Sequence, residues 1–543
     1  MDGMMMDYQL TVSKILGRAQ QVFPGKEVVS VMPSGKKHRY TYGDLHGRVL
    51  RLMGVLKQLG VNPGDRIGTF AWNHFRHLEL YYAMPCMGAV LHTLNIRLSA
   101  EQLEYIVNHA EDQVIFVDAS LVKALEPLAK QFKSVRQYVI VTEDGKLPET
   151  TLSPVVDYEA LMAKATPELA FPELPENTAC GLCYTSGTTG NPKGVLYSHR
   201  AIFLHSLLAM TTDTLHLSER DTMLPVVPMF HANAWGQPFA CAMAGAKLVF
   251  AGSDVSPQNI VGLIQSENVT IAAGVPTIWN ALLQYMRQTK PNLGRLNRMV
   301  VGGSAVPRSM IVAFKNEFNV DIIQGWGMTE MSPLGSTGWL KSKADDWSDD
   351  RKFDALATAG LPAPCVDMKI VDAIDGHELP WDGKSVGELL VRGPTIVKAY
   401  YNNPEANAKQ FTPDGWFRTG DVASLDPDAY LHIADRTKDL IKSGGEWISS
   451  VEMENAVMAM AGILEAAVVA RPDPKWDERP VVFAVRQPGA GKPDAPEIVA
   501  PLAKSFAKWQ LPAPEDVRFI PLVPRTSVGK FDKKVLRLEF KRA

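Results

Sequence analysis

Short apolar runs alternate with amphipathic stretches through most of the first 350 residues. Four of the runs are brief and nearly continuous, which predicts buried strands at residues 67–71, 114–117, 247–250 and 298–301. Between them, residues 101–110 and 257–267 carry apolar side chains at helical spacing. This alternation predicts a layered α/β fold with largely parallel sheets.

The pattern changes near residue 360. Asp-Gly pairs at 375–376, 382–383 and 414–415 are turn signals between short strand-like runs. We therefore expect a small β-rich, barrel-like subdomain at about 360–434. The acidic segment 345–354 that precedes it is typical of a solvated surface helix or loop.

A second change follows residue 435. The pattern predicts a helix, two strands and a further helix, at residues 451–460, 466–470, 481–485 and 498–509. These elements form an α+β unit large enough to fold as a domain. The short charged segment before them is typical of a hinge. We expect an N-terminal domain at 1–435, a hinge linker at 436–441 and a mobile C-terminal domain at 442–543.

Composition narrows the class of protein. A chain of 543 residues exceeds what one core supports, and 46% hydrophobic and 21% charged residues are ordinary for a soluble protein. The net charge of -3 does not indicate nucleic-acid binding. No secretory signal or long apolar run is visible, so we expect no membrane span and a cytoplasmic enzyme. The pair Cys180 and Cys183 is read as two core residues, because no second pair follows at zinc spacing.

The segment Thr185–Gly194 is suited to holding phosphate. It combines three glycines, four hydroxyl side chains and Lys193 in ten residues. Glycine lets the main chain approach an anion, and hydroxyls add donors. The lysine follows Asn-Pro and precedes Gly, which differs from the phosphate loop of NTPases. The loop therefore indicates a different use of ATP.

Further segments carry candidate chemistry. Each alone has a structural explanation, as a turn, a strand end, a core tryptophan or a surface lysine. They are Val227–Trp235, Gln324–Glu330, Trp416–Asp421 with the charged linker and Lys442–Ile448 that follow it, and Pro524–Lys530.

In this order and spacing, the segments resemble the adenylate-forming superfamily of acyl-CoA synthetases, luciferases and peptide-synthetase adenylation domains. The resemblance runs from about Tyr40 to Lys541. The segments Phe230–Trp235 and Lys442–Ser450 are most similar to bacterial long- and medium-chain fatty-acyl-CoA synthetases. Trp326 stands where many relatives carry Tyr, and either ring can stack on a purine.

The resemblance implies an ATP site in which acid attacks the α-phosphate, giving an acyl-adenylate and pyrophosphate. Thr185 and Glu330 would hold Mg²⁺, a hard cation that prefers oxygen ligands. Lys530 would stabilise charge on the transferring group, and Asp421 would accept from the ribose hydroxyls. The implied ATP and AMP contacts are Thr185, Ser186, Gly187, Thr188, Thr189, Gly190, Lys193, Gly303, Ser304, Ala305, Gln324, Gly325, Trp326, Gly327, Thr329, Asp421, Arg436, Lys438, Lys442 and Lys530.

The resemblance also implies an acid site and a CoA site. His231, Trp235 and Gly303 would contact the acid, with His231 among the catalytic residues beside Lys530, Glu330 and Thr185. Trp235 would either gate an apolar tunnel or form the floor of a short pocket. The small domain would rotate at Lys438 for the second half-reaction. CoA would then meet Lys442, Gly444, Gly445 and Trp447.

These features predict an ATP-dependent, AMP-forming acid–CoA ligase for a medium- to long-chain fatty acid. Short thioether acids, such as 3-(methylthio)propanoate, and aryl acids are alternatives. A carrier-loading adenylation enzyme is disfavoured because little sequence follows Lys530, and luciferase-like oxidation is rarer among relatives. A non-catalytic nucleotide-binding regulator predicts loss of Lys530, Glu330 or Asp421, yet all three are present. By analogy, a homodimer formed through the N-terminal domain is possible.

Overall fold

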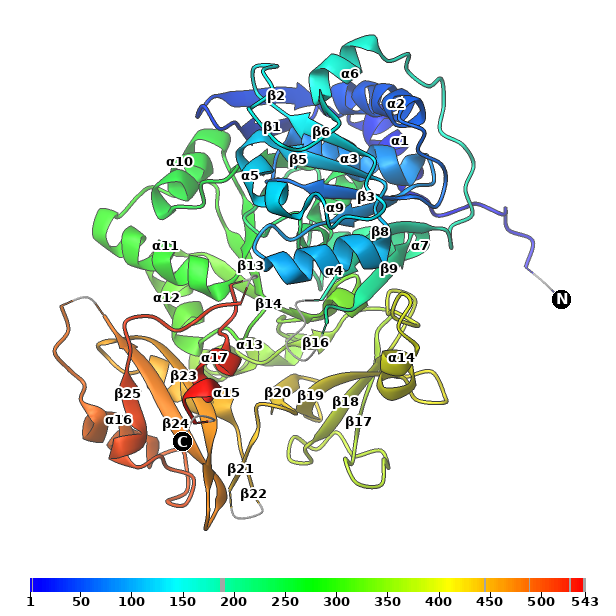
Figure 1. The fold of residues 1–543 in the computed structure, drawn as a ribbon. Helices are drawn as coiled ribbons and strands as arrows, with labels where there is room; N and C mark the ends of the chain where they lie inside the picture. Colours follow the sequence, from blue (N-terminus) through cyan, green and yellow to red (C-terminus); the bar gives the residue numbers. More distant parts are fainter. Residues whose placement is uncertain (2, 186–190, 444–445, 488, 527–528, 541–543) are drawn as a thin grey trace.

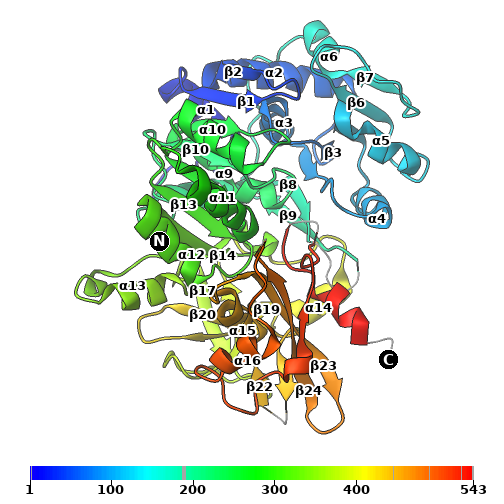
Figure 2. The same ribbon diagram turned by 90° about the vertical axis from the view of Figure 1, so that its left-hand side faces the viewer.

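The computed structural model of the chain describes residues 1, 3–185, 191–443, 446–487, 489–526 and 529–540. Within them, two large sheets with their helices form the N-terminal part, and two smaller sheets follow in chain order (Figure 1). The turned view shows the C-terminal elements gathered below the large sheets (Figure 2). A large α/β N-terminal part and a smaller C-terminal part confirm the predicted fold class.

The larger of the two N-terminal sheets has nine described strands. Its central six strands, from β14 to β1, run parallel, and antiparallel strands flank them on both sides. In spatial order the strands are β16 (Leu361–Pro362), β15 (Leu334–Thr337), β14 (Asp321–Gly327), β13 (Arg298–Gly302), β12 (Ile271–Gly274), β10 (Thr222–Pro225), β11 (Lys247–Phe250), β1 (Glu27–Val31) and β2 (Lys37–Thr41).

The second sheet has seven described strands, and only its last pair, β8 and β9, is antiparallel. In spatial order they are β7 (Val155–Asp157), β6 (Gln137–Val141), β5 (Val114–Asp118), β3 (Arg66–Phe70), β4 (Val90–Thr93), β8 (Ala179–Tyr184) and β9 (Gly194–Ser198). The strands predicted at 67–71, 114–117, 247–250 and 298–301 are therefore confirmed, as is the parallel arrangement.

The helices form layers around these sheets. One core joins residues of α1, α2, α3 and α9 to both sheets, so these helices lie between them. Separate cores place α10–α12 against the nine-stranded sheet and α4 and α5 against the other sheet. Their bounds are α1 (Val12–Val22), α2 (Tyr42–Gln58), α3 (Phe75–Cys86), α4 (Ala100–Ala110), α5 (Val122–Leu125), α6 (Tyr158–Lys164), α7 (His199–Met210), α8 (Ala232–Trp235), α9 (Gln237–Ala244), α10 (Pro257–Glu267), α11 (Pro276–Thr289) and α12 (Arg308–Phe318).

Helix ends follow capping chemistry. The Thr41 hydroxyl accepts from the Asp44 N–H while the Asp44 carboxylate accepts from the Thr41 N–H, which satisfies the first turn of α2. Ser99 and Gln102 do the same for α4. The acidic segment forms part of helix α13 (Asp349–Leu356), whose charged side chains Asp349, Asp350, Arg351 and Asp354 are exposed, as its composition predicts.

The segment after residue 360 forms an antiparallel four-stranded sheet in the order β17-β18-β19-β20. Its strands are β17 (Asp367–Val371), β18 (Gly387–Arg392), β19 (Phe417–Leu425) and β20 (Leu431–Arg436), with helix α14 (Pro404–Gln410) between β18 and β19.

The C-terminal elements build their own core around a mostly antiparallel sheet. Helix α16 ends at Leu502, whereas its apolar spacing predicts a helix to Trp509. Pro501 offers no N–H, so the last turn loses a hydrogen bond and the chain leaves the helix. The elements are β21 (Ile441–Ser443), β22 (Glu446–Ile448), α15 (Ser450–Met458), β23 (Ile463–Asp473), β24 (Asp477–Arg486), α16 (Ala495–Leu502), β25 (Val517–Phe519) and α17 (Lys533–Arg537).

The C-terminal part reaches back to the large sheets. The loop before α17, red in Figure 1, extends to the ends of β13 and β14. At the same interface, the Asn280 amide of α11 donates to the Leu464 carbonyl of β23 at 3.4 Å. No helix in the described ranges is both long and apolar enough to cross a bilayer.

Candidate active site

The base of the predicted phosphate loop is closed by two hydrogen bonds between Thr185 and Lys193. The Thr185 N–H donates to the Lys193 carbonyl at 2.9 Å, and the Lys193 N–H donates to Thr185 Oγ1 at 3.2 Å. Strands β8 and β9 lead into and out of the loop as an antiparallel pair. The predicted phosphate contacts Ser186, Gly187, Thr188, Thr189 and Gly190 lie outside the described residues.

The Glu330 carboxylate lies against this loop through Tyr400. The Tyr400 hydroxyl donates to Glu330 Oε1 at 2.7 Å, and Lys193 Nζ lies 4.8 Å from the centre of the Tyr400 ring. Burial raises the pKa of Tyr400, so the phenol stays a protonated donor. The next residue back, Thr329, accepts from the Tyr197 hydroxyl at 2.7 Å. No sequence motif marked Tyr400, yet it joins the loop to the predicted metal ligand.

The glycines around Trp326 have steric reasons. A Cβ on Gly327 would lie 1.9 Å from the Pro333 carbonyl oxygen, and one on Gly335 would lie 2.5 Å from the Trp326 ring. The indole is therefore seated on a surface that only glycine provides. The Gln324 side chain, which is buried, accepts from the Val306 N–H at 3.2 Å and holds the loop that contains Gly303, Ser304 and Ala305.

The Asp421 carboxylate lies between two hydrogen-bond donors, one of them the Trp326 indole. Trp326 Nε1 donates to Asp421 Oδ2 at 3.0 Å, and Arg436 Nε lies 2.7 Å from Oδ1. The cross-strand pairing of β19 and β20 places Asp421 opposite Arg436. Burial raises the pKa of Asp421, and the neighbouring Arg436 charge opposes that rise. Each carboxylate oxygen has a second lone pair, which leaves acceptor capacity for a ligand hydroxyl.

Lys530 reaches the same region from the C-terminal part. Its Cε lies 3.6 Å from the position that a Cβ on Gly303 would occupy, so the lysine lies next to this glycine. Burial, followed by the Arg436 charge, lowers the pKa of Lys530 to about 8. Burial, followed by the Lys530 charge, lowers the pKa of His231 to about 3, so the imidazole is neutral at physiological pH.

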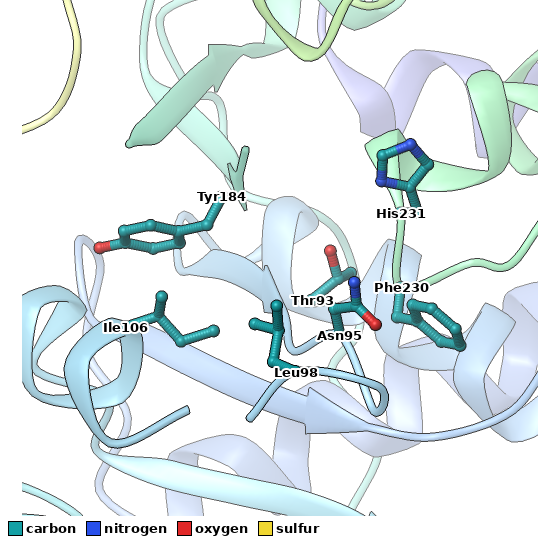
Figure 3. Close-up of a pocket in the computed structure, with 7 residues that line it drawn as sticks. All are labelled: Thr93, Asn95, Leu98, Ile106, Tyr184, Phe230 and His231. Atoms are coloured by element: carbon teal, nitrogen blue, oxygen red, sulfur yellow. The ribbon is translucent and has the colours of Figure 1, made fainter. Parts of the chain in front are cut away.

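His231 borders a small hollow between the two large sheets (Figure 3). The hollow is lined by Thr93, Asn95, Leu98, Ile106, Tyr184, Phe230 and His231. Figure 3 shows Phe230 and His231 on one side and Tyr184 with Ile106 on the other. Trp235 is half-buried, and its ring lies 3.4 Å from the position of a Cβ on Gly302. His231 precedes helix α8 and Trp235 is its last residue. This short turn has a left-handed backbone, which costs non-glycine residues ~1–2 kcal/mol each.

Other predicted residues lie apart from this region. Lys442 and Trp447 are exposed on the β21–β22 hairpin, which both views place at the far end of the C-terminal part (Figures 1 and 2). Gly444 and Gly445 lie outside the described residues. Lys438, by contrast, follows β20 close enough to Lys530 for the two charges to interact, and burial lowers the pKa of Lys438. The structure therefore places Lys530, Asp421 and Gly303 in one region, and it places Lys442 and Trp447, expected for ATP and CoA, elsewhere.

The comparison with protein families agrees with this arrangement. The family model described as "AMP-binding enzyme" matches residues 16–401, and the model of its C-terminal domain matches residues 452–530. The chain belongs to the AMP-binding enzyme family.

Curated members of this family match along their whole length. A long-chain-fatty-acid–CoA ligase of Thermus thermophilus is 48% identical, over 99% of this chain and 97% of that protein. A 3-methylmercaptopropionyl-CoA ligase of Ruegeria lacuscaerulensis is 43% identical, over 100% and 99%. A medium-chain-fatty-acid–CoA ligase of Ectopseudomonas oleovorans is 42% identical, over 99% and 97%. Among solved structures, ATP-bound MatB from Rhodopseudomonas palustris matches with a TM-score of 0.83 at 26% identity, covering 98% of this chain and 99% of that one.

Proposed function

We propose that this AMP-binding enzyme is an ATP-dependent, AMP-forming acid–CoA ligase whose substrates are medium- to long-chain fatty acids. The observation that carries the proposal is the meeting of Lys530, from the C-terminal part, with Gly303 and with the charge of Asp421. A cation here faces the point where a carboxylate would attack the α-phosphate. The identities of 48% and 42% to fatty-acid–CoA ligases support the choice of acid.

The residues divide the work of the first half-reaction. Neutral His231 would orient the acid, and Asp421 with Arg436 would hold the ribose. The Thr185–Gly194 loop would retain the β- and γ-phosphates as pyrophosphate leaves. Protonated Lys530 would stabilise the charge that develops on the transferring group. The acid and ATP would thereby be held as neighbours before bond formation.

Mg²⁺ fits the residues beside the loop. Glu330 supplies a buried carboxylate, Thr185 supplies a hydroxyl, and such oxygen ligands suit a hard cation. When bound with ATP, the ion neutralises phosphate charge.

The second half-reaction requires a different arrangement of the chain. We infer an N-terminal domain at 1–435, a hinge at 436–441 that turns at Lys438, and a C-terminal domain at 442–543. Rotation would withdraw Lys530 and bring Lys442, Gly444, Gly445 and Trp447 to the adenylate, where the CoA thiol displaces AMP. Lys442 and Trp447 are exposed in this structure, so both side chains are free to contact the adenylate site after such a rotation. A cytoplasmic homodimer, formed through the N-terminal domain, completes the proposal.

One other acid class has specific support. The chain is 43% identical to 3-methylmercaptopropionyl-CoA ligases, so a short thioether acid is the second candidate. The two acid classes require different roles of Trp235. A long fatty acid requires that Trp235 opens an apolar tunnel, whereas a short thioether acid fits a pocket whose floor is Trp235.

The test is acid-dependent exchange of pyrophosphate into ATP, followed by CoA-dependent release of AMP. A panel from acetate to palmitate, with 3-(methylthio)propanoate, gives kcat/KM against chain length. In an apolar tunnel each added methylene contributes about 0.8 kcal/mol, roughly fourfold in kcat/KM. A rise through the medium chain lengths supports the fatty-acid proposal. A maximum at the thioether acid selects the second candidate, and no exchange with any acid refutes the ligase.

A further inference from the structure

The segment between His231 and Gly236 has a backbone that L-amino acids rarely adopt. Ala232, Asn233, Ala234 and Trp235 have φ values of 42°, 54°, 49° and 54°. Gly236 continues the left-handed conformation at φ 71°. Hydrogen bonds from the Ala234 N–H to the His231 carbonyl and from the Gly236 N–H to the Asn233 carbonyl close the turn, at 3.0 and 2.9 Å. Strained segments of this kind persist only where their surroundings hold them.

The Asn233 side chain supplies such a hold. It is 3% exposed, and its Oδ1 accepts from Cys183 Sγ at 3.3 Å. Its amide nitrogen lies 3.6 Å from the position of a Cβ on Gly181, so the carboxamide packs next to β8. Asparagine also tolerates positive φ better than most residues. Asn233 therefore fits both the backbone and the contact.

Cys183 is well suited to be the partner. Burial raises the pKa of its thiol to about 11, so the sulfur carries a proton to donate. Thr93 Oγ1 lies 3.3 Å from the same sulfur and can donate to it. Cys183 is the penultimate residue of β8, two residues before Thr185 at the phosphate loop. The contact thus ties the turn to the strand that carries the loop.

The turn holds the two side chains expected at the acid. His231 precedes it, and Trp235 ends it against Gly302. Gly236 cannot carry a side chain, because a Cβ there would lie 2.4 Å from the His205 ring. The position of His231 relative to Trp235 is therefore set by the conformation of residues 232–235.

We propose that Asn233 is a positioning residue: its hydrogen bond from Cys183 holds the left-handed turn that orients His231 and Trp235 toward the acid. The inference rests on the proposed function for its catalytic consequence. Its structural part, that the carboxamide holds the turn, stands independently of the acid used.

The first experiment replaces Asn233 by glycine, which accepts positive φ and removes only the side chain. We expect kcat for acid-dependent exchange to fall at least tenfold, with KM for ATP changed less than twofold and a flatter chain-length profile. Amide hydrogen exchange at Ala234 and Gly236 should become faster. A profile, a kcat and exchange rates all equal to those of the wild type would overturn the proposal.

Cys183 provides the reciprocal test. Cys183→Ser keeps a donor and should retain most activity, whereas Cys183→Ala should lower kcat as Asn233→Gly does. Asn233→Gly and Cys183→Ala break the same contact. The kcat of the variant that carries both changes should therefore be no lower than that of the less active single variant. Additive losses would show that the two residues act separately and would contradict the proposal, even if Asn233→Gly folds poorly.

The matched control is Lys290→Gly. Lys290 is an exposed residue at φ 46° at the end of α11, so the change relieves the same backbone strain away from the site. It should leave exchange of the Ala234 and Gly236 amides and the chain-length profile unchanged. If none of the acids supports pyrophosphate exchange by the wild-type enzyme, the proposed function fails. The hydrogen-exchange comparison of Asn233→Gly with Lys290→Gly still decides whether Asn233 holds the turn.

Discussion

The indole N–H of Trp326 donates to the Asp421 carboxylate at 3.0 Å, which joins the end of β14 to the middle of β19. A tyrosine at this position would have no ring N–H to place there. Trp326 therefore makes a polar contact through its ring edge, besides the purine stacking that the resemblance implies for its face.

We predict that Trp326→Phe raises KM for ATP about tenfold, since a hydrogen bond to a charged group contributes about 1.5 kcal/mol or more. The pKa of Asp421, already raised by burial, should rise further without this donor. ATP titrations at saturating acid measure the effect. Trp339→Phe is the control, because the Trp339 indole donates to the Thr214 carbonyl instead. Equal KM values in wild type and Trp326→Phe would contradict the assignment.

The pH dependence of the first half-reaction should report Lys530. Burial lowers its pKa to about 8, and only the protonated form can stabilise anionic charge. The value of kcat/KM should therefore be highest below that pKa and should fall as the pH rises through about 8. The corresponding alkaline fall in kcat, which we call the alkaline limb, should occur at higher pH than the fall in kcat/KM, since bound phosphates favour the charged lysine.

Substitution at Lys530 tests the same assignment. Lys530→Arg should move the alkaline limb upward, because arginine stays charged. Lys530→Ala should abolish exchange, whereas the exposed neighbour change Lys534→Ala should not. An unchanged pH profile in Lys530→Arg would assign the limb to another group.

Tyr400→Phe should raise the Mg²⁺ concentration that pyrophosphate exchange requires. The change removes a 2.7 Å hydrogen bond to Glu330, and we expect a loss of about 1 kcal/mol, roughly fivefold in apparent affinity. Mg²⁺ titration of the exchange rate is the measurement. Tyr42→Phe removes a comparable buried bond, to the Ala246 carbonyl, and should lower stability without altering the Mg²⁺ requirement.

A buried ion pair fixes the segment that follows Lys530. Lys533 Nζ lies 2.7 Å from Glu454 Oε1 and donates to Ser450 Oγ at 2.6 Å. Lys533→Met should destabilise the C-terminal part by about 3–5 kcal/mol, because it leaves the Glu454 charge buried without its partner. Denaturant unfolding measures this loss. Lys533→Met with Glu454→Met should recover part of it, and a double variant less stable than Lys533→Met would argue against the pair.

Much of the fold could be predicted from the sequence, because apolar periodicity reflects burial directly. Strand β5 and helix α10 lie where the pattern predicts them. The family and the fold class are likewise confirmed. Helix α16 shows a limit: its apolar spacing continues past Leu502, but Pro501 removes a backbone donor.

The site was predictable where residues belong to motifs and not where tertiary contact alone gives them a role. Tyr400 is one of 14 tyrosines, and only folding brings it to Glu330 and Lys193. The left-handed turn at Ala232–Trp235 also escaped prediction, because it contains no glycine before Gly236. Lys442 and Trp447 show the converse: their motif is clear, yet both side chains are exposed and lie apart from Asp421 and Lys530.

The turn at residues 232–236 has a consequence for how such enzymes diversify. Two of the three residues expected to meet the acid, His231 and Trp235, adjoin or belong to this one short stretch, whereas those expected to meet ATP come from the segments at β8, β14, β19 and the C-terminal loop. Substitutions in a stretch this compact can change which acid the enzyme accepts while leaving the residues expected to bind ATP unchanged. Relatives that share 42–48% of this sequence and carry names for different acids fit such an evolutionary separation.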